Sequence, residues 1–179
     1  MSQDSRKVRF GLWYDFRNPP QWRQSSDRLY GEILDQIAWG ENNGFDDVWL
    51  SEHHFIDDGY LSSILPAAAA IAARTKRIRI ASGVLLMPFH NPVRLAEDIA
   101  VVDVISGGRF ELGVGVGFKL EEFEGFGVSF KERGACTNES LEIIRRLLSG
   151  ESVSFKSEFF DFKNVKVTPE PIQKPHPPI

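Results

Sequence analysis

Hydrophobic and polar positions along the chain follow two periods, one typical of strands and one typical of helices. Four short runs favour buried strands because β-branched, aromatic and other apolar residues are concentrated in them. A stretch with apolar residues every three or four positions follows each run, as Leu29, Ile33 and Ile37 illustrate. The predicted strands are Val8 to Tyr14, Asp47 to Ser51, Ile78 to Leu86 and Arg109 to Val114.

Capping signals indicate where four predicted helices begin and end. The strongest is Asn91 followed by Pro92, because asparagine caps a helix and proline suits its first position. Asparagine and glycine residues mark the C-terminal ends of three of these helices, but not that of the helix ending at Arg74. The predicted helices run from Ser25–Asp27 to Asn42–Gly44, from about Ser62 to Arg74, from Asn91 to Gly107-Gly108, and from roughly Glu132 to Leu148 before Gly150.

Strand-then-helix units at intervals of ~30 to 40 residues predict an α/β fold with parallel strands and right-handed crossovers. The pattern fits either a barrel or a doubly wound sheet. Both architectures place functional sites at the C-terminal ends of the strands. His53 and His54 follow the second strand, His90 follows the third, and the glycines at 113, 115 and 117 follow the fourth. We therefore expect the unusual residues to collect on one face.

The C-terminal part of the chain departs from this repeat. Ser152 to Phe162 alternates aromatic and polar residues, which predicts a short hairpin. Thr168 to Ile179 carries five prolines and is expected to be a connector rather than a core element. We treat residues 1–179 as one domain, with the hairpin and the connector in residues 152–179.

Composition limits the classes of partner. Among the 179 residues no apolar run approaches the ~20 residues of a membrane span, and no leader pattern begins at Met1. We therefore expect a cytoplasmic protein that does not bind membranes. The net charge of -4, with basic residues scattered along the chain, argues against nucleic-acid binding and favours small-molecule partners. The single cysteine, Cys136, excludes an intramolecular disulfide and is expected to pack on a helix.

The candidate chemistry lies in the segment Val48 to Phe55, where a buried strand runs into Glu52, His53 and His54. Imidazole changes protonation near neutral pH, so either histidine is a candidate proton donor, proton acceptor or ligand. Side chains alternate across a strand, so at most one histidine faces a given pocket. The alternative is that both are packing or surface residues.

Other motifs fail on their spacing. The glycines Gly113, Gly115 and Gly117 do not match the G-x-G-x-x-G pattern of a dinucleotide site, and the chain lacks the G-K-[ST] end of a phosphate loop. Glu52-His53-His54 lacks the helical spacing of a zinc site, so no metal is expected. The glycines permit a flat ligand to approach the backbone, or they form only a tight turn.

Four segments, in this order, resemble the bacterial luciferase-like monooxygenase family, and the similarity runs from Arg9 to about Ile179. The resemblance implies a TIM barrel that binds reduced flavin or the deazaflavin F420 at its C-terminal face. The segments are Val48 to Phe55, His90 to Asp98, Gly108 to Phe110 and Phe123 to Gly127.

The resemblance also implies roles for individual residues. His53 matches the histidine assigned as catalytic, near the reactive edge of the flavin, with Glu52 and His54 behind it. The segment at 82–84 matches a bulge of the third strand that often holds a non-prolyl cis peptide beneath the isoalloxazine ring. The predicted cofactor-binding residues are Ser82, Gly83, Val84, Gly113, Gly115 and Glu122.

Two departures from the family pattern affect these expectations. Gly115 and Val116 stand where luciferase alpha subunits carry a cysteine and the arginine that serves the flavin phosphate. We therefore expect flavin to bind this chain weakly or not at all. The sequence also covers about four of the eight strand–helix units of a barrel of ~250 residues. It is expected to be a fragment of a longer protein or a truncated relative, with two open sheet edges.

The resulting interpretation is a flavin-dependent monooxygenase in which reduced FMN and O₂ act on a small organic substrate. An F420-dependent hydride-transfer oxidoreductase is one alternative, which the missing arginine favours. A truncated, non-catalytic module for flavin binding or assembly is the other.

We also expect a homodimer through the alanine-rich helix 62–74. This helix is apolar around much of its circumference, and the run Ala67 to Ala70 would let a second helix approach closely. The resemblance implies dimers joined through the second and third helices, with Ala68 and Ala69 expected at the contact. The alternative is a helix that packs only against its own sheet.

Overall fold

The computed structural model describes residues 8–179. The expectation about a leader at Met1 concerns residues outside this range. The four predicted strands and four predicted helices are all present, with one further short helix, α4. The elements are β1 (Gly11–Tyr14), η1 (Pro20–Trp22), α1 (Ser26–Asn42), β2 (Asp47–Leu50), α2 (Ile64–Arg74), β3 (Arg79–Ser82), β4 (Leu85–Leu86), η2 (Met87–Phe89), α3 (Pro92–Ser106), β5 (Phe110–Glu111), β6 (Val114–Gly115), α4 (Leu120–Phe126), α5 (Arg133–Leu148), β7 (Val153–Lys156) and β8 (Asp161–Val165).

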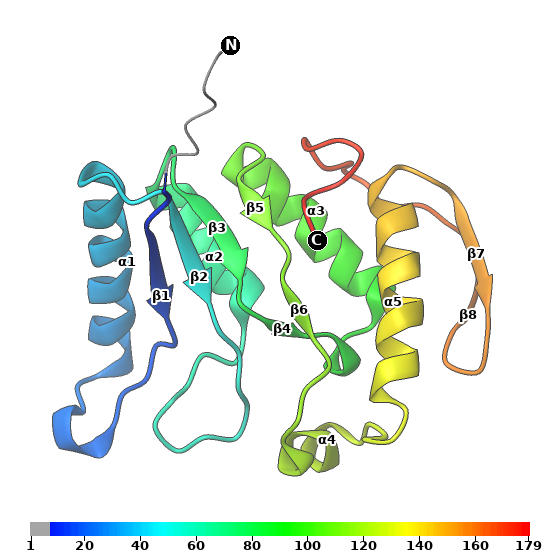
Figure 1. The fold of residues 1–179 in the computed structure, drawn as a ribbon, viewed down its shortest axis with the longest axis horizontal. Helices are drawn as coiled ribbons and strands as arrows, with labels where there is room; N and C mark the ends of the chain where they lie inside the picture. The colour runs from blue at the N-terminus through cyan, green and yellow to red at the C-terminus, as the bar shows by residue number, and fades with distance from the viewer. Residues whose placement is uncertain (1–7) are drawn as a thin grey trace.

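The main sheet is parallel, with the strand order β1-β2-β3-β5. Successive side chains along each strand point to opposite faces of the sheet. Val48, Leu50, Ile80 and Phe110 are fully buried and belong to the hydrophobic core that the helices complete. In Figure 1, α2 and α3 lie behind the strands, with α1 and α5 at the two sides. This arrangement is half of a barrel with its helices outside.

The third and fourth predicted strands are interrupted rather than continuous. Each is split, and the second pieces, β4 and β6, form a separate parallel pair. At the break, the hydroxyl of Ser82 donates to the carbonyl of Gly113 (2.8 Å) and accepts from its N–H (2.9 Å). A side chain therefore replaces the backbone ladder at this point, which periodicity does not reveal.

Both predicted ends of α3 are confirmed by capping contacts, whereas Ser25, at the start of α1, makes no side-chain capping hydrogen bond. The side chain of Asn91 accepts hydrogen bonds from the backbone N–H groups of Val93 (3.0 Å) and Arg94 (3.2 Å). At the other end of α3, Gly107 adopts the left-handed conformation with φ 68°. The first strand begins at Gly11, three residues later than predicted, and Val8 is largely exposed.

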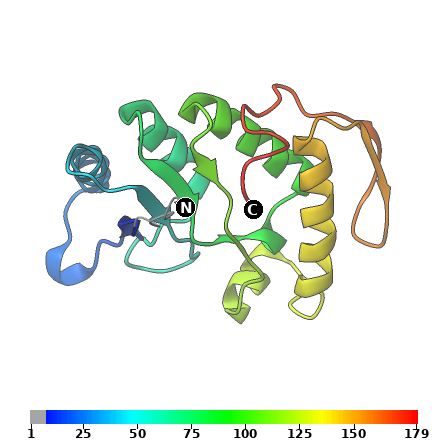
Figure 2. The same ribbon diagram turned by 45° about the horizontal axis from the view of Figure 1, so that its top comes forward.

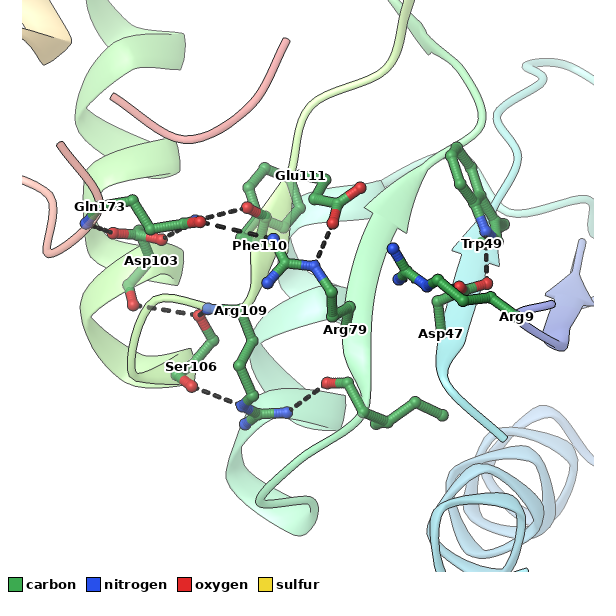
Figure 3. A network of polar contacts seen from close by, with 11 residues as sticks. Arg9, Asp47, Trp49, Arg79, Asp103, Ser106, Arg109, Phe110, Glu111 and Gln173 are labelled. Atoms are coloured by element: carbon green, nitrogen blue, oxygen red, sulfur yellow. Dashed lines mark hydrogen bonds and ion pairs between the residues drawn. The ribbon is translucent and has the colours of Figure 1, made fainter. Parts of the chain in front are cut away.

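The connector predicted at 168–179 contains no helix or strand, but it packs against the sheet more closely than we expected. Gln173 donates from its backbone N–H (3.0 Å) and its side chain (2.7 Å) to the two carboxylate oxygens of Asp103, which is fully buried. The same side chain donates to the carbonyl of Phe110 (2.7 Å), as Figure 3 shows. A buried carboxylate requires such donors, and only a segment from beyond α5 supplies them here.

Arg109, from the segment that resembles the family, has a structural role in the same region. Its guanidinium donates to the carbonyls of Ala72 (3.0 Å), Thr75 (3.1 Å) and Ile78 (2.8 Å), at and just beyond the end of α2. It also donates to the carbonyl of Ser106 (2.6 Å), as Figure 3 shows. These carbonyls would otherwise lack partners at a helix C-terminus. Arg109 therefore joins α2 to the start of β5.

The loops that follow β1, β2, β4 and β6 gather at one edge of the fold, the lower edge in Figure 1, and Figure 2 shows the same grouping from a second direction. The prediction that the unusual residues collect on one face is confirmed. The hairpin predicted at 152–162 is also confirmed, as the antiparallel pair β7 and β8. No helix among residues 8–179 is long and apolar enough to cross a bilayer.

Candidate functional site

A cleft of ≈ 380 Å³ opens at the C-terminal ends of β2, β4 and β6. This volume lies in the range of small-molecule sites. Its lining includes two aromatic side chains that are unusually exposed: Trp13 at 62% and Phe118 at 70%. It also includes four polar side chains, those of Ser51, Glu52, His53 and Tyr60.

His53 lines the cleft, and its side chain is 19% exposed. Its Nδ1 lies 2.9 Å from Oε1 of Glu122. A carboxylate only accepts hydrogen bonds, so Nδ1 carries the proton in this contact. Nε2 makes no hydrogen bond to any residue from 8 to 179, and in the neutral ring it is an acceptor. The geometry thus fixes the tautomer of His53 and leaves one nitrogen for a ligand.

Glu122 lies on α4 and is almost fully buried. Besides His53, its Oε1 accepts the backbone N–H of His54 at 2.9 Å. Its second oxygen, Oε2, is buried and has no partner within the described part of the chain. α4 is only seven residues long, too short for hydrophobic periodicity, which is why sequence reasoning missed the helix while the resemblance identified its acidic residue.

Glu52 and His54 form a second pair behind the cleft wall. Oε1 of Glu52 accepts from Nε2 of His54 (2.7 Å), and Oε2 accepts from the backbone N–H of Leu86 (2.9 Å). Nε2 of His90 lies 3.6 Å from Oε1, which is too long for a hydrogen bond and leaves an electrostatic contact. His54 is enclosed by the rings of Phe55, Phe89 and Phe126.

The pKa of Glu52 reflects two opposing effects. Burial alone would raise the pKa of this carboxyl, because it penalises the charged form. The contacts with His54 and His90 and the N–H of Leu86 outweigh burial and hold the pKa at about 2, below the ordinary 4.5. Glu52 is therefore ionised at neutral pH, and both of its oxygens are engaged.

The predicted cofactor-binding residues divide into two groups. Gly83, Val84 and Gly115 line the cleft, and the peptide bond between Gly83 and Val84 is cis, as the resemblance implied. Ser82, Gly113 and Glu122 lie behind the wall instead. A Cβ atom on Gly113 would lie 2.2 Å from the carbonyl oxygen of Ser82, so glycine is required there for backbone packing.

Ser51, Tyr60, Trp13 and Phe118 line the cleft but were not identified from the sequence as site residues. Ser51 ends a predicted strand, and Tyr60 belongs to a loop without a recognisable motif. The signal available in the sequence was the position of Trp13 and Phe118, two aromatic residues close to the ends of predicted strands. No group of three or more His, Cys, Asp or Glu side chains in residues 8–179 is placed to hold a metal ion.

Comparison with known proteins agrees with the family resemblance seen in the sequence. The sequence model of the family described as luciferase-like monooxygenase matches residues 8–179. The chain is 29% identical over 174 residues to the oxygenase component of the flavin-dependent trigonelline monooxygenase of Acinetobacter baylyi, covering 96% of this chain and 48% of that protein. It spans about half the length of the curated relatives it matches.

Solved structures agree with the fold. The monooxygenase RslO1 from Streptomyces bottropensis is 34% identical and superposes with a TM-score of 0.89, over 95% of this chain and 52% of that one. An F420-dependent secondary alcohol dehydrogenase, solved with an F420-acetone adduct, is 23% identical with a TM-score of 0.76, over 94% of this chain and 50% of that one. The predicted partial barrel is confirmed. The trigonelline monooxygenase is flavin-dependent by name, and the alcohol dehydrogenase is F420-dependent.

Proposed function

This chain belongs to the luciferase-like monooxygenase family, and from that premise we propose that it supplies the flavin site of a flavin-dependent monooxygenase acting on a small organic substrate. One observation carries the proposal. The cleft brings His53, the Gly83–Val84 peptide and Gly115 together, although they come from three separate parts of the chain: the loop after β2, the link between β3 and β4, and the end of β6. These are the residues that the resemblance assigns to the reactive edge and the face of the flavin ring.

The residues present fit a flat ring system. One wall is backbone at Gly83 and Gly115, and Trp13 and Phe118 add aromatic surface to the same cleft. Aromatic rings and bare backbone suit close contact with a planar ligand. A reduced flavin bound there would supply the electrons and the reactivity toward O₂. The protein would supply orientation, exclusion of water and proton handling.

His53 is the proposed proton-handling group. With Nδ1–H directed to Glu122, its Nε2 takes a proton from the reacting groups and later returns it. When His53 is protonated, the buried carboxylate of Glu122 stabilises the imidazolium through the same 2.9 Å contact. Glu122 is therefore a proposed positioning residue rather than a ligand to the flavin.

The phosphate of FMN has no evident partner in the cleft. No Lys or Arg side chain is among the described residues that line it. A charge-assisted contact to phosphate contributes roughly 1.5 to 3 kcal/mol, so its absence moves affinity from micromolar toward millimolar. We propose that this part of the protein holds the ring alone.

The test is a titration of the chain into FMN, riboflavin and F420, followed by flavin or deazaflavin fluorescence. We expect weak binding, with equal affinity for FMN and riboflavin because the phosphate is not contacted. Gly115→Ala should weaken binding, since the new Cβ would lie 2.6 Å from the side chain of Val84 and displace it. Gly134→Ala, on an exposed part of α5 with open space around it, is the control.

Each outcome has a distinct meaning. A tight FMN complex that riboflavin does not form would reveal a phosphate site and contradict the ring-only proposal. Preferential binding of F420 would favour hydride transfer, the second candidate, for which the similar fold of an F420-dependent secondary alcohol dehydrogenase is the support. Failure of all three ligands to bind at millimolar protein would exclude the cleft as a flavin site. Binding without turnover in the complete enzyme would favour the non-catalytic module.

A further inference from the structure

Two hydroxyl groups form a pair in the cleft, apart from the residues already assigned to proton transfer and the flavin ring. The oxygens of Ser51 and Tyr60 lie 2.7 Å apart. Ser51 directly follows β2 and is buried, whereas Tyr60 comes from the loop before α2 and is half-buried. Both side chains line the cleft.

The contacts around Tyr60 fix its position. The N–H of the next residue, Leu61, donates to the carbonyl of Asp15 (2.8 Å), and the carbonyl of Leu61 accepts the N–H of His53 (3.1 Å). The guanidinium of Arg17 lies 5.9 Å from the Tyr60 ring centroid, while pairing with Asp58 at 2.5 Å. The Tyr60 ring is therefore held on several sides rather than free to rotate into solvent.

Counting hydrogens shows what the pair offers to a ligand. Each hydroxyl group has one hydrogen, and the contact between Ser51 and Tyr60 uses only one of the two. Whichever group donates within the pair, one hydroxyl hydrogen is left over. Because Ser51 is buried, the arrangement in which Ser51 donates and Tyr60 directs its hydrogen into the cleft leaves no donor unpaired in the wall.

Most other polar groups of the cleft are already engaged in hydrogen bonds within the chain. Both oxygens of Glu52 are engaged by His54 and Leu86, and Nδ1 of His53 is engaged by Glu122. What remains is the hydroxyl hydrogen, the indole N–H of the largely exposed Trp13, and Nε2 of His53. The ring centroid of His53 lies 4.9 Å from that of Tyr60, so the hydroxyl hydrogen is the donor beside the proposed proton-handling group. The remaining lining surface is backbone and apolar side chains, without a described cation.

We propose that the Ser51–Tyr60 pair is the substrate-selecting element of the cleft, and that Tyr60 donates a hydrogen bond to an oxygen, such as a carbonyl, of a neutral and largely apolar substrate. This inference rests on the proposed function, because it places the substrate oxygen beside His53. An anionic substrate would find no cation among the described lining residues, and both oxygens of the one lining carboxylate, Glu52, are already engaged within the chain. A hydrocarbon would leave the hydroxyl donor unpaired.

The experiment compares two probes of nearly equal shape, benzaldehyde, which has a carbonyl oxygen, and styrene, which has none. Binding to the chain is followed by NMR through the indole N–H of Trp13, which lines the same cleft. We expect benzaldehyde to bind roughly three- to tenfold more tightly than styrene, the range for one neutral hydrogen bond. Tyr60→Phe should bring the ratio close to one by weakening benzaldehyde alone.

Two further variants define the mechanism. Ser51→Ala keeps the Tyr60 hydroxyl but removes the group that orients it, so the ratio should fall only part of the way. Tyr30→Phe is the control, because Tyr30 lies on α1 and packs on Phe16 at 4.7 Å between ring centroids. The ratio should not change in this variant.

The proposal is overturned if the unmodified chain shows no preference for benzaldehyde, or if Tyr60→Phe weakens both probes equally and thereby acts only on packing. It is also overturned if Tyr60→Phe lowers riboflavin affinity and leaves the probe ratio intact, which would make the pair a cofactor ligand and preserve the proposed function. If the chain binds no flavin but Tyr60→Phe still removes the preference for benzaldehyde over styrene, selection by Tyr60 is supported and the flavin proposal fails.

Discussion

The two adjacent histidines have different environments, and the difference separates activity from stability. His53 faces the cleft, whereas His54 is buried and donates to Glu52 at 2.7 Å. His53→Ala should lower turnover of the complete enzyme by roughly 10²- to 10⁴-fold, the usual effect of losing a general acid or base. Its melting temperature should stay close to that of the unmodified protein.

His54→Ala should show the opposite pattern. It leaves the buried carboxylate of Glu52 without one of its donors, which costs roughly 1.5 to 3 kcal/mol of unfolding free energy. Turnover and thermal unfolding are measured on both variants, with His176→Ala on the connector as the control. If His54→Ala proves the more damaging to turnover, the imidazoles have been assigned the wrong way round.

Glu52 predicts a dependence of stability on pH. Its pKa is about 2 in the folded protein against an ordinary 4.5, so the folded state favours the ionised form. That stability is fully present above pH 4.5 and is lost as the pH falls from 4.5 toward 2. The difference corresponds to roughly 3 kcal/mol. Urea unfolding across this range should show a steeper loss in the unmodified protein than in Glu52→Gln.

Glu97→Gln is the matched control for this measurement, because Glu97 is a carboxylate on α3 whose side chain is 46% exposed and pairs only with the exposed Arg94. It should leave the pH dependence unchanged. Equal slopes in the unmodified protein and Glu52→Gln would show that the contacts of Glu52 contribute no net stabilisation.

At the scale of single residues, the sequence predicted those residues whose role depends only on their own type and on their neighbours in the chain. Asn91 is a helix cap by residue type and neighbours alone, and the Glu-His-His segment is conspicuous at a strand end. Ser51 and Tyr60 were missed because their importance depends on a 2.7 Å contact across a loop, which no periodicity encodes. The packing roles of Ser82 and Gly113 depend in the same way on two strands meeting.

Among the elements, α2 and α3 present an outer surface that the fold does not cover. Val101, Val104 and Ile105 on α3 are 40% to 48% exposed, and a groove of ≈ 280 Å³ beside them includes Ala69 of α2. We propose that a second copy of the chain packs on this surface. Ala68, which we had expected at the contact, is fully buried in the chain's own core, so a charge there would unfold the protein.

The corrected test places glutamate at Ala69 and Val101. The double variant should shift a dimer toward monomer at micromolar concentration in light scattering, because two buried charges oppose association. Trp39→Glu is the control, since Trp39 is an exposed apolar residue on α1, away from the groove. A dimer that survives the double variant would have to use another surface, such as the open edge of β1.

Most helices and strands were predicted correctly because residues that are close together in the chain determine their lengths and caps. The exceptions have physical reasons. α4 is too short for periodicity, and the breaks between β3 and β4 and between β5 and β6 arise from a side chain that bridges two strands.

At the scale of the whole molecule, the connector is part of the folded structure. Gln173→Ala should reduce the unfolding free energy by roughly 1 to 3 kcal/mol, because the buried carboxylate of Asp103 loses a donor. Lys174→Ala, at the exposed neighbouring position, should have little effect since its pairing with Glu170 is on the surface. Chemical denaturation of both variants checks this, and equal stability would show that the docking is incidental.

The overall architecture followed from the order of strands and helices together with the family resemblance. The docking of the connector did not, because it joins residues 70 positions apart through a single buried carboxylate. Five prolines in twelve residues favour an extended chain, but they do not reveal where that chain lies.

The break in the strands at Ser82 and Gly113 divides the strands into two units that differ in how firmly they are packed. The main sheet has four hydrogen-bonded strands, whereas the β4–β6 pair has two residues in each strand; Leu85 and Leu86 of β4 are buried, but Val114 and Gly115 of β6 are only half-buried. The Ser82 hydroxyl and a few backbone bonds, such as that from Gly83 N–H to Leu50 (2.7 Å), connect the two units. Regions with few buried contacts open locally at a lower free energy than the core. The wall of the cleft can therefore exchange its amide hydrogens and admit a ligand by a sub-global opening, while the four-stranded sheet beneath it remains closed.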